Sequence, residues 1–148
     1  MTIDLDGIRP RVAATREAVT RPGGAVVGHQ LTITCPYCNQ KHHHGEGYGH
    51  RESHCATEVT VRKSQVSSDA YDNPGYVLCD ATEDVNWSAE RAMGQLWVAR
   101  ATYRRLTADL ERRKTYPALT SKERRVRAEL KTHADSLAEI LRAAGVNL

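Results

Sequence analysis

The segment from Thr34 to Cys55, TCPYCNQKHHHGEGYGHRESHC, holds three of the four cysteines and five of the seven histidines in this chain of 148 residues. Thiolates and imidazoles are the side chains that most often bind zinc in proteins. Phenylalanine is absent and aromatic residues make up 5% of the sequence, so little material is available for a hydrophobic core. Small domains of this kind commonly take part of their stability from a bound metal. We therefore expect a metal site in this segment to decide what the chain folds into.

Cys35 and Cys38 form a C-x-x-C turn, which aims two thiolates at one tetrahedral ion. Cys55 follows 17 positions after Cys38, a spacing typical of zinc-ribbon and treble-clef sites. The fourth ligand is expected to be a histidine. His50 is favoured because it precedes Cys55 by five positions, which leaves the chain room to curl back. The predicted site is a structural zinc ion bound by Cys35, Cys38, His50 and Cys55.

Other residues remain open for the fourth position. His44 is the second choice, and His42 shares a face with it if their segment is extended, while His43 points away. His54 is disfavoured because it is adjacent to a cysteine ligand, and neighbouring side chains rarely reach one ion together. Cys79 is a further alternative to either histidine. The histidines that are not ligands are expected to support the site by donating hydrogen bonds to backbone carbonyls.

The metal is expected to be structural, and the protein is expected not to be an enzyme. A catalytic zinc keeps an open coordination position and has a general base nearby. The sequence contains neither an H-E-x-x-H nor an H-x-E…P-C-x-x-C pattern. The rival hypothesis is a metal-dependent nuclease or hydrolase that uses the remaining histidines with Glu46, Glu52 or Glu58. A C-x-x-C without an ion is a further alternative, and a thioredoxin-like redox pair fits less well because no βαβ pattern surrounds it.

The whole chain predicts an α+β fold in three parts. Residues 1–24 are expected to form an N-terminal helix or arm, because apolar and β-branched residues recur at helical spacing: Ile8, Val12, Thr15 and Val19. Residues 25–84 are expected to form a small antiparallel, zinc-ribbon-like sheet held together by the zinc. Its strands are predicted from their β-branched and alternating residues at Ala25–Cys35, Glu58–Arg62 and Tyr76–Cys79.

Residues 85–148 are expected to form a long antiparallel helical hairpin. Apolar residues recur about every 3.5 positions in two stretches, Ala92–Leu110 and Val126–Ala144, where the second includes His133 as a buried neutral side chain. Thr120 and Glu123 fit a capping box at the start of the second helix, and Gly145 fits the residue after its end. The apolar seam predicts packing against the zinc module or pairing with a second copy of the chain.

Positive charge gathers near the tip of this hairpin, where only Asp109, Glu111 and Glu123 oppose it. The cations are Arg104, Arg105, Arg112, Arg113, Lys114, Lys122, Arg124, Arg125 and Arg127. Such a local field attracts polyanions, most commonly the phosphate backbone of nucleic acid. An acidic host or virion protein is the other candidate partner. The alternative interpretation is a solvated helical face whose arginine stems cover the apolar seam.

No apolar run approaches the roughly 20 residues that span a bilayer, and Met1–Pro10 lacks the apolar stretch of a signal peptide. We therefore expect no membrane association and a cytoplasmic location, which is the host cytoplasm if the chain is phage-encoded. In a reducing compartment, cysteines favour metal binding over disulfides.

The pattern CPYC-x-x-x-H-x-H-G, followed by GHR-x-x-HC and PGYVL, resembles small uncharacterised proteins of actinobacteria and their phages. The resemblance covers Cys35–Leu78 and implies a zinc-binding loop and a phage or prophage origin, without implying an activity. It groups into one motif His42, His44, Gly45, Gly49, His50, Arg51, His54 and Cys55. In such proteins a glycine often follows the C-x-x-C; here Asn39 does, and asparagine tolerates the left-handed conformation.

The function expected from the sequence is a non-enzymatic zinc-binding interaction module that binds nucleic acid or a host protein complex through its basic hairpin. The alternatives are the metal-dependent nuclease or hydrolase described above and a structural oligomer, such as a virion component.

Overall fold

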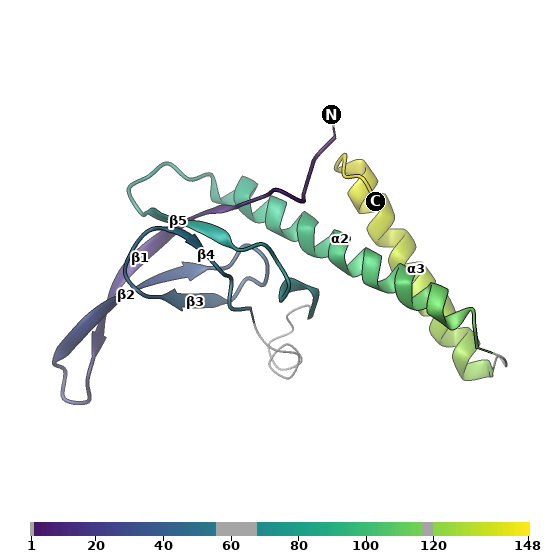
Figure 1. Cartoon of the computed structure of the whole chain (residues 1–148), viewed down its shortest axis with the longest axis horizontal. Helices are drawn as coiled ribbons and strands as arrows, with labels where there is room; N and C mark the ends of the chain where they lie inside the picture. The colour runs from purple at the N-terminus through teal and green to yellow at the C-terminus, as the bar shows by residue number, and fades with distance from the viewer. Residues whose placement is uncertain (1, 56–67, 117–119) are drawn as a thin grey trace. The chain divides into compact units, whose positions relative to one another are not determined.

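The computed structural model describes residues 2–55, 68–116 and 120–148 and has the α+β fold that the sequence predicts (Figure 1). Five strands form one sheet with the order β3-β2-β1-β5-β4, and two long helices follow it in the chain. The chain divides into two compact units. One unit holds Gly7–Gln95, and the other combines Met1–Asp6 with Leu96–Leu148, so that the division falls inside the first long helix.

The sheet lies in the first unit and is built around its longest strand, β1 (Arg11–Thr20). This strand pairs antiparallel with β2 (Val26–Thr34) and parallel with β5 (Tyr76–Asp80). The sheet is extended by β3 (Lys41–His44) beside β2 and by β4 (Gly49–Arg51) beside β5. The sheet is therefore mixed, and the prediction of an antiparallel sheet was wrong for the β1–β5 pair.

The predicted strands at Ala25–Cys35 and Tyr76–Cys79 are confirmed by β2 and β5. The strand predicted at Glu58–Arg62 lies outside the described residues. A short 3-10 helix, η1 (Ser68–Ala70), precedes β5.

The prediction of an N-terminal helix was wrong, because β1 occupies its second half. Val12 and Ala14 are buried and alternate with exposed neighbours, which is the period of a strand that faces a core on one side. The spacing of Val12, Thr15 and Val19 also fits a helix, and this is the pattern on which the prediction was based. Pairing on both sides of β1 and the β-branched character of these residues favour the strand.

The first long helix, α2 (Trp87–Arg113), begins against the C-x-x-C turn. Gln95 donates from Nε2 to the carbonyl oxygens of Pro36 at 2.7 Å and Tyr37 at 3.0 Å. One residue earlier, a Cβ built on Gly94 would lie 2.5 Å from the carbonyl oxygen of Pro36. The helix backbone therefore rests directly on the turn that carries two predicted ligands.

Replacing Gly94 with alanine should lower the thermal unfolding midpoint, although alanine favours a helix by about 1 kcal/mol. The added methyl group meets backbone atoms of Pro36 that cannot rotate away, and overpacking of this kind costs about 1–3 kcal/mol. Gly45→Ala is the matched control, because nothing lies within 4 Å of a Cβ at that position. Equal unfolding midpoints for the two variants would show that the backbone of Gly94 does not pack directly on Pro36.

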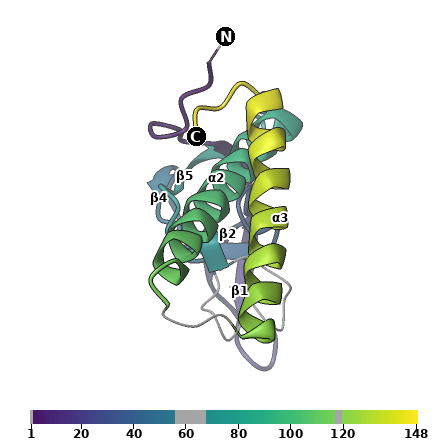
Figure 2. The same ribbon diagram turned by 90° about the vertical axis from the view of Figure 1, so that its right-hand side faces the viewer.

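The second unit contains the rest of α2, the helix α3 (Ser121–Ala143) and the N-terminal segment. Figures 1 and 2 show α3 turning back from the end of α2 as the second arm of the predicted hairpin. Leu5 is fully buried, and Ile3 donates its backbone N–H to Gly145 at 2.8 Å. The buried guanidinium of Arg100 binds Asp6 at 2.6 Å, so the N-terminal segment is tied to both helices.

The ends of α3 lie where the sequence predicts them, whereas its buried face differs from the prediction. Thr120 caps the helix by accepting from the backbone N–H of Glu123 at 3.1 Å, and Gly145 follows the end with φ +77°. The buried residues are Ala134, Ala138 and Leu141, while His133 is exposed and Ile140 is 56% exposed. The predicted spacing of about 3.5 residues therefore did not identify the buried face of α3, two of whose three buried residues are alanines. None of the described helices has the length and apolar character to cross a membrane.

Candidate metal centre

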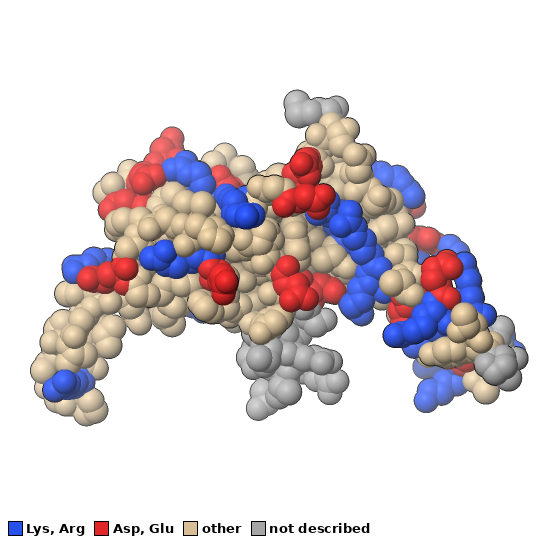
Figure 3. Space-filling model, viewed as in Figure 1, with Lys and Arg blue, Asp and Glu red and all other residues tan. Residues whose placement is uncertain are grey.

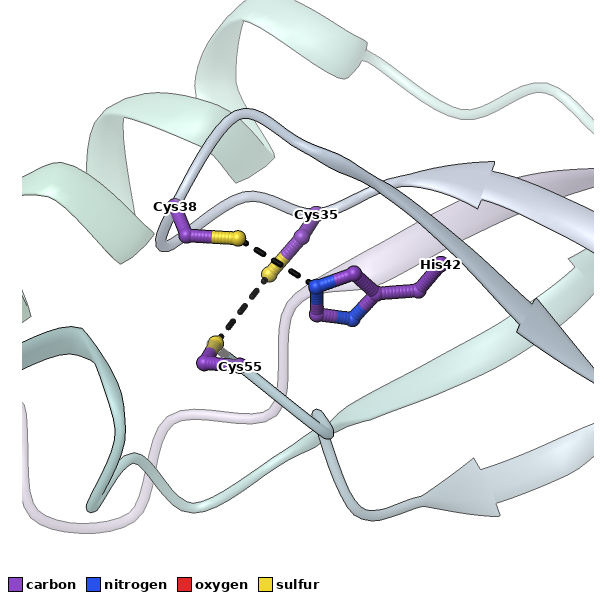
Figure 4. Close-up of side chains that lie close together, drawn as sticks. All are labelled: Cys35, Cys38, His42 and Cys55. Carbon is purple, nitrogen blue, oxygen red and sulfur yellow. Dashed lines mark hydrogen bonds between the residues drawn. The ribbon is translucent and has the colours of Figure 1, made fainter. Parts of the chain in front are cut away.

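Four ligand side chains meet within the first unit: Cys35, Cys38, His42 and Cys55. Their sulfur and nitrogen atoms all lie within 4.8 Å of one another, and all four residues are buried (Figure 4). Cys35 Sγ is 3.8 Å from Cys55 Sγ, and Cys38 Sγ is 3.3 Å from His42 Nε2. The group could therefore hold one metal ion.

These separations match a tetrahedral zinc site. Two sulfurs that each lie about 2.3 Å from one zinc ion at the tetrahedral angle are about 3.8 Å apart. A sulfur and an imidazole nitrogen in the same geometry are about 3.6 Å apart, close to the distance between Cys38 and His42. All four ligand atoms lie within 4.8 Å of one another, and two of their separations already have the spacing of a zinc site.

The local fold explains why three of these ligands come together. Cys35 directly follows β2, and its backbone carbonyl accepts from the N–H of Asn39 at 3.0 Å, which closes the C-x-x-C turn. Asn39 has φ +59°, the left-handed conformation expected at this position. The backbone then returns as β3, in which His42 and His44 are buried and His43 is exposed. The predicted alternation of the three histidines is thus confirmed.

The structure places His42, and not the favoured His50, beside the three sulfurs. β3 pairs with β2 immediately after the turn, so the Cys-x-x-Cys-x-x-x-His spacing returns His42 to the first two thiols. His50 lies on β4, where it is exposed and has Nε2 at 3.2 Å from the carbonyl oxygen of Pro74. Cys79 is buried outside the group, with Sγ 3.7 Å from the carbonyl oxygen of Val77.

The buried phenol of Tyr76 orients His42. Tyr76 Oη lies 3.0 Å from His42 Nδ1, 2.7 Å from His44 Nε2 and 3.3 Å from the carbonyl oxygen of Ser53. A proton on His42 Nδ1 that is donated to Tyr76 leaves Nε2 with its lone pair toward the sulfurs. Such a partner fixes the tautomer and ring orientation of a histidine ligand. His44 therefore supports the site through Tyr76.

Cys55 is held by two polar side chains. Asn73 donates from Nδ2 to Cys55 Sγ at 3.2 Å, and Ser53 Oγ lies 3.4 Å from the same sulfur. Asn73 Oδ1 also accepts the backbone N–H of Gly75 at 2.9 Å, which fixes the turn before β5. The amide of Asn73 is a donor that stabilises the negative charge of a thiolate at Cys55.

The proximity of three thiols separates their pKa values. Hydrogen bonds from Cys35 and Cys55 lower the pKa of Cys38 to about 3. Hydrogen bonds with Cys38 and Cys55, together with burial, raise the pKa of Cys35. For Cys55 the contact with Cys35 lowers the pKa, but the contact with Cys38 and burial outweigh it, so that its pKa is raised.

Burial lowers the pKa of His42, so its imidazole is neutral at pH 7. An ion that enters the site then meets one thiolate and one neutral imidazole, and it must displace protons from Cys35 and Cys55. Metal affinity should therefore fall as the pH is lowered.

Replacing Tyr76 with phenylalanine should weaken metal binding by about 10–100-fold, the usual effect of losing a partner of a ligand. The change leaves His42 Nδ1 without its partner inside the fold. A competition titration with a chelating dye measures the affinity. Tyr37→Phe is the control, because the Tyr37 hydroxyl donates to the carbonyl of Gly75 at 2.7 Å. That variant should lose stability with less loss of affinity, and an equal loss in both would reject the role of Tyr76.

The nine cations predicted to bind a partner fall into two groups. Arg113 and Arg127 are partly buried. Arg113 binds Glu123 at 2.9 Å and so links α2 to α3, whereas Arg127 binds Glu123 within α3 at 3.3 Å and donates to the backbone carbonyl of Arg113. The other seven are exposed, and three of them pair with an acid of the same helix: Arg112 with Asp109, Lys114 with Glu111 and Arg125 with Glu129. Figure 3 shows Lys and Arg side chains gathered at this end of the helices, with acidic side chains among them. Part of the predicted positive surface therefore serves the hairpin itself.

No protein-family model, curated protein sequence or solved structure matches this chain. The resemblance to actinobacterial and phage proteins stays a prediction.

Proposed function

We propose that the chain is a non-enzymatic interaction module whose sheet is stabilised by one structural zinc ion. The observation that carries this proposal is the buried group of three cysteines and His42. Thiolate-rich tetrahedral sites select zinc over magnesium or calcium, which prefer oxygen ligands and larger coordination numbers.

The number and burial of the ligands favour a structural role. Four protein ligands complete a tetrahedral shell, whereas catalytic zinc sites commonly have three protein ligands and leave the fourth position to water or substrate. Each of the four residues is at most 7% exposed, so substrate would have little access to the ion.

Three of the four remaining histidines of the segment have structural contacts that support this proposal over a hydrolase. His43 Nδ1 lies 3.0 Å from the hydroxyl of Thr32, His44 binds Tyr76, and His50 lies near the carbonyl of Pro74. Each contact ties its strand to a neighbouring segment.

Replacing zinc with cobalt tests whether the four protein ligands leave no open coordination position. The cobalt form should show the intense visible bands of tetrahedral thiolate coordination, and added azide should leave them unchanged. An azide-induced shift would reveal an open position and would favour the metal-dependent hydrolase. Wild-type protein and a Cys79→Ser variant should give the same spectrum, because Cys79 lies outside the ligand group.

We further propose that the hairpin tip binds the phosphate backbone of nucleic acid. From Arg104 to Glu129 the sequence has nine cations and four carboxylates, so the tip stays positive after its ion pairs are formed. Arg104 and Lys122 are exposed and have no ion pair among the residues that the structure describes. These two side chains are therefore the best probes of partner binding.

The Arg104→Glu, Lys122→Glu double variant should lose most of its retention on DNA, RNA and heparin columns, and its binding should depend less on salt. The matched control is Lys41→Glu with Arg142→Glu, which makes the same change in net charge at exposed positions away from the tip. Unchanged retention of the tip variant, or equal loss in both, would reject the proposal. An acidic protein partner would then be the remaining candidate.

A further inference from the structure

The outer part of the β1–β2 hairpin, residues 18–30, forms an arm that extends from the sheet (Figure 1). Every residue from Ala18 to Gly28 is exposed. The exposed side chains include Val19, Val26 and Val27, which are 36%, 58% and 49% exposed. Both faces of this two-stranded arm are therefore in contact with solvent.

The edges of the arm also lack neighbouring strands. β5 pairs with β1 only as far as Ala14, and β3 pairs with β2 only from Leu31 onward. Among the described residues, no strand lies against the outer edge of Val26–Gln30. Such an edge presents backbone N–H and C=O groups that can pair with another extended strand.

The arm carries few of the usual protections of an open edge, although the Glu46 carboxylate lies 3.7 Å from Nδ1 of His29. Arg21 is the only charged residue from Ala18 to Gln30, and Pro22 lies in the turn, outside both strands. Natural proteins usually protect open edges with lysine, proline or a covering segment. A two-stranded hairpin is only marginally stable by itself in water.

We propose that the β2 edge of the arm pairs antiparallel with the same edge of a second copy of this chain. The open edge requires an extended strand, and its valines and lack of charge favour an occupant that is also apolar and uncharged. The segment Val26–Gln30 has this character itself. An antiparallel pair of identical segments is related by a two-fold axis, the usual symmetry of a homodimer.

The register follows from the length of the open edge. β3 occupies the edge from Leu31, so the free segment is centred on Gly28. Pairing about this centre places Val26 of one copy opposite Gln30 of the other, and Gly28 opposite Gly28. No like charges face each other in this register. A contact of this size should give a weak dimer whose population rises with protein concentration.

Gly28 offers a direct test, because a Cβ there has nothing within 4 Å and its φ is ordinary. Gly28→Lys places two ammonium groups opposite each other at the axis and should abolish the dimer, and Gly28→Glu should do the same. An equimolar mixture of the two variants should restore a dimer, because opposite charges then face each other. Gly28→Val should retain the dimer, since β-branched residues favour cross-strand pairing.

Sedimentation velocity over a concentration series measures each mass, and circular dichroism verifies that each variant is folded. The proposal expects a wild-type dimer that dissociates on dilution, monomeric Lys and Glu variants, and recovery in their mixture. A wild-type chain that stays monomeric at the highest concentration would overturn it. A dimer that persists unchanged in Gly28→Lys would also overturn it and would place the interface elsewhere.

Discussion

Replacing Cys55 with serine should abolish stoichiometric zinc binding and unfold the Gly7–Gln95 unit, whereas the same replacement at Cys79 should do neither. Structural zinc contributes about 10–16 kcal/mol of binding free energy in small zinc domains at pH 7. A typical domain is stable by only about 5–15 kcal/mol in total. Loss of one thiolate ligand removes enough of this contribution to leave the unit without its fold.

Cys79 is the matched control because it is also a buried cysteine but lies outside the ligand group. Metal content by mass spectrometry, together with circular dichroism, measures both variants. We expect one zinc per chain in Cys79→Ser and substoichiometric zinc with lost sheet signal in Cys55→Ser. A Cys55→Ser protein that keeps its zinc and its fold would remove Cys55 from the site.

Replacing His42 with alanine should weaken zinc binding by at least two orders of magnitude, while His50→Ala should leave it nearly unchanged. His42 supplies the only nitrogen in the group, and its loss also removes a partner of Tyr76. His50 is exposed and has its Nε2 near the carbonyl of Pro74. The expected cost at His50 is one hydrogen bond, about 0.5–1.5 kcal/mol of stability.

Competition with a chelating dye measures both affinities under the same conditions. His42→Cys is a useful third variant, because a thiolate at this position can restore a four-ligand site. We expect affinity to recover in that variant relative to His42→Ala. The opposite order, with His50→Ala the weaker binder, would favour the ligand set predicted from the sequence.

The three cysteine ligands could be predicted from the sequence, because a C-x-x-C turn and a third cysteine form a pattern that depends little on the rest of the fold. The histidine could not be selected in the same way. His42 and His50 both have a plausible spacing, and the choice depends on β3 pairing with β2 directly after the turn. The alternation of His42 and His44 on one face was the sequence signal that pointed to His42, the histidine that lies beside the three sulfurs.

Residues that support the site were missed because they are distant in the sequence. Tyr76 and Asn73 reach the ligands from the segment that includes β5, and Gly94 packs on the turn from α2. No local pattern links these positions to the cysteines. The strand β1 was assigned as a helix for a related reason, since its parallel pairing with β5 joins segments more than 60 residues apart.

The helices were easier to predict than their contacts. The periodicity and the caps of α3 are local features, so Thr120 and Gly145 were identified correctly. The roles of the charged residues depend on which helix faces which. Arg113 binds Glu123 across the hairpin, and Arg127 donates across it to the carbonyl of Arg113, yet both arginines were assigned to partner binding from the sequence alone.

Metal removal followed by thermal unfolding tests whether one zinc ion stabilises the sheet unit. We predict that the purified chain contains one zinc ion. Dialysis against a strong chelator should then lower the unfolding midpoint of the sheet unit sharply, and added zinc should restore it. Cys35, Cys38 and Cys55 should become reactive toward a thiol reagent only after the metal is removed. A chain without bound metal, or a midpoint that does not change on chelation, would contradict the account.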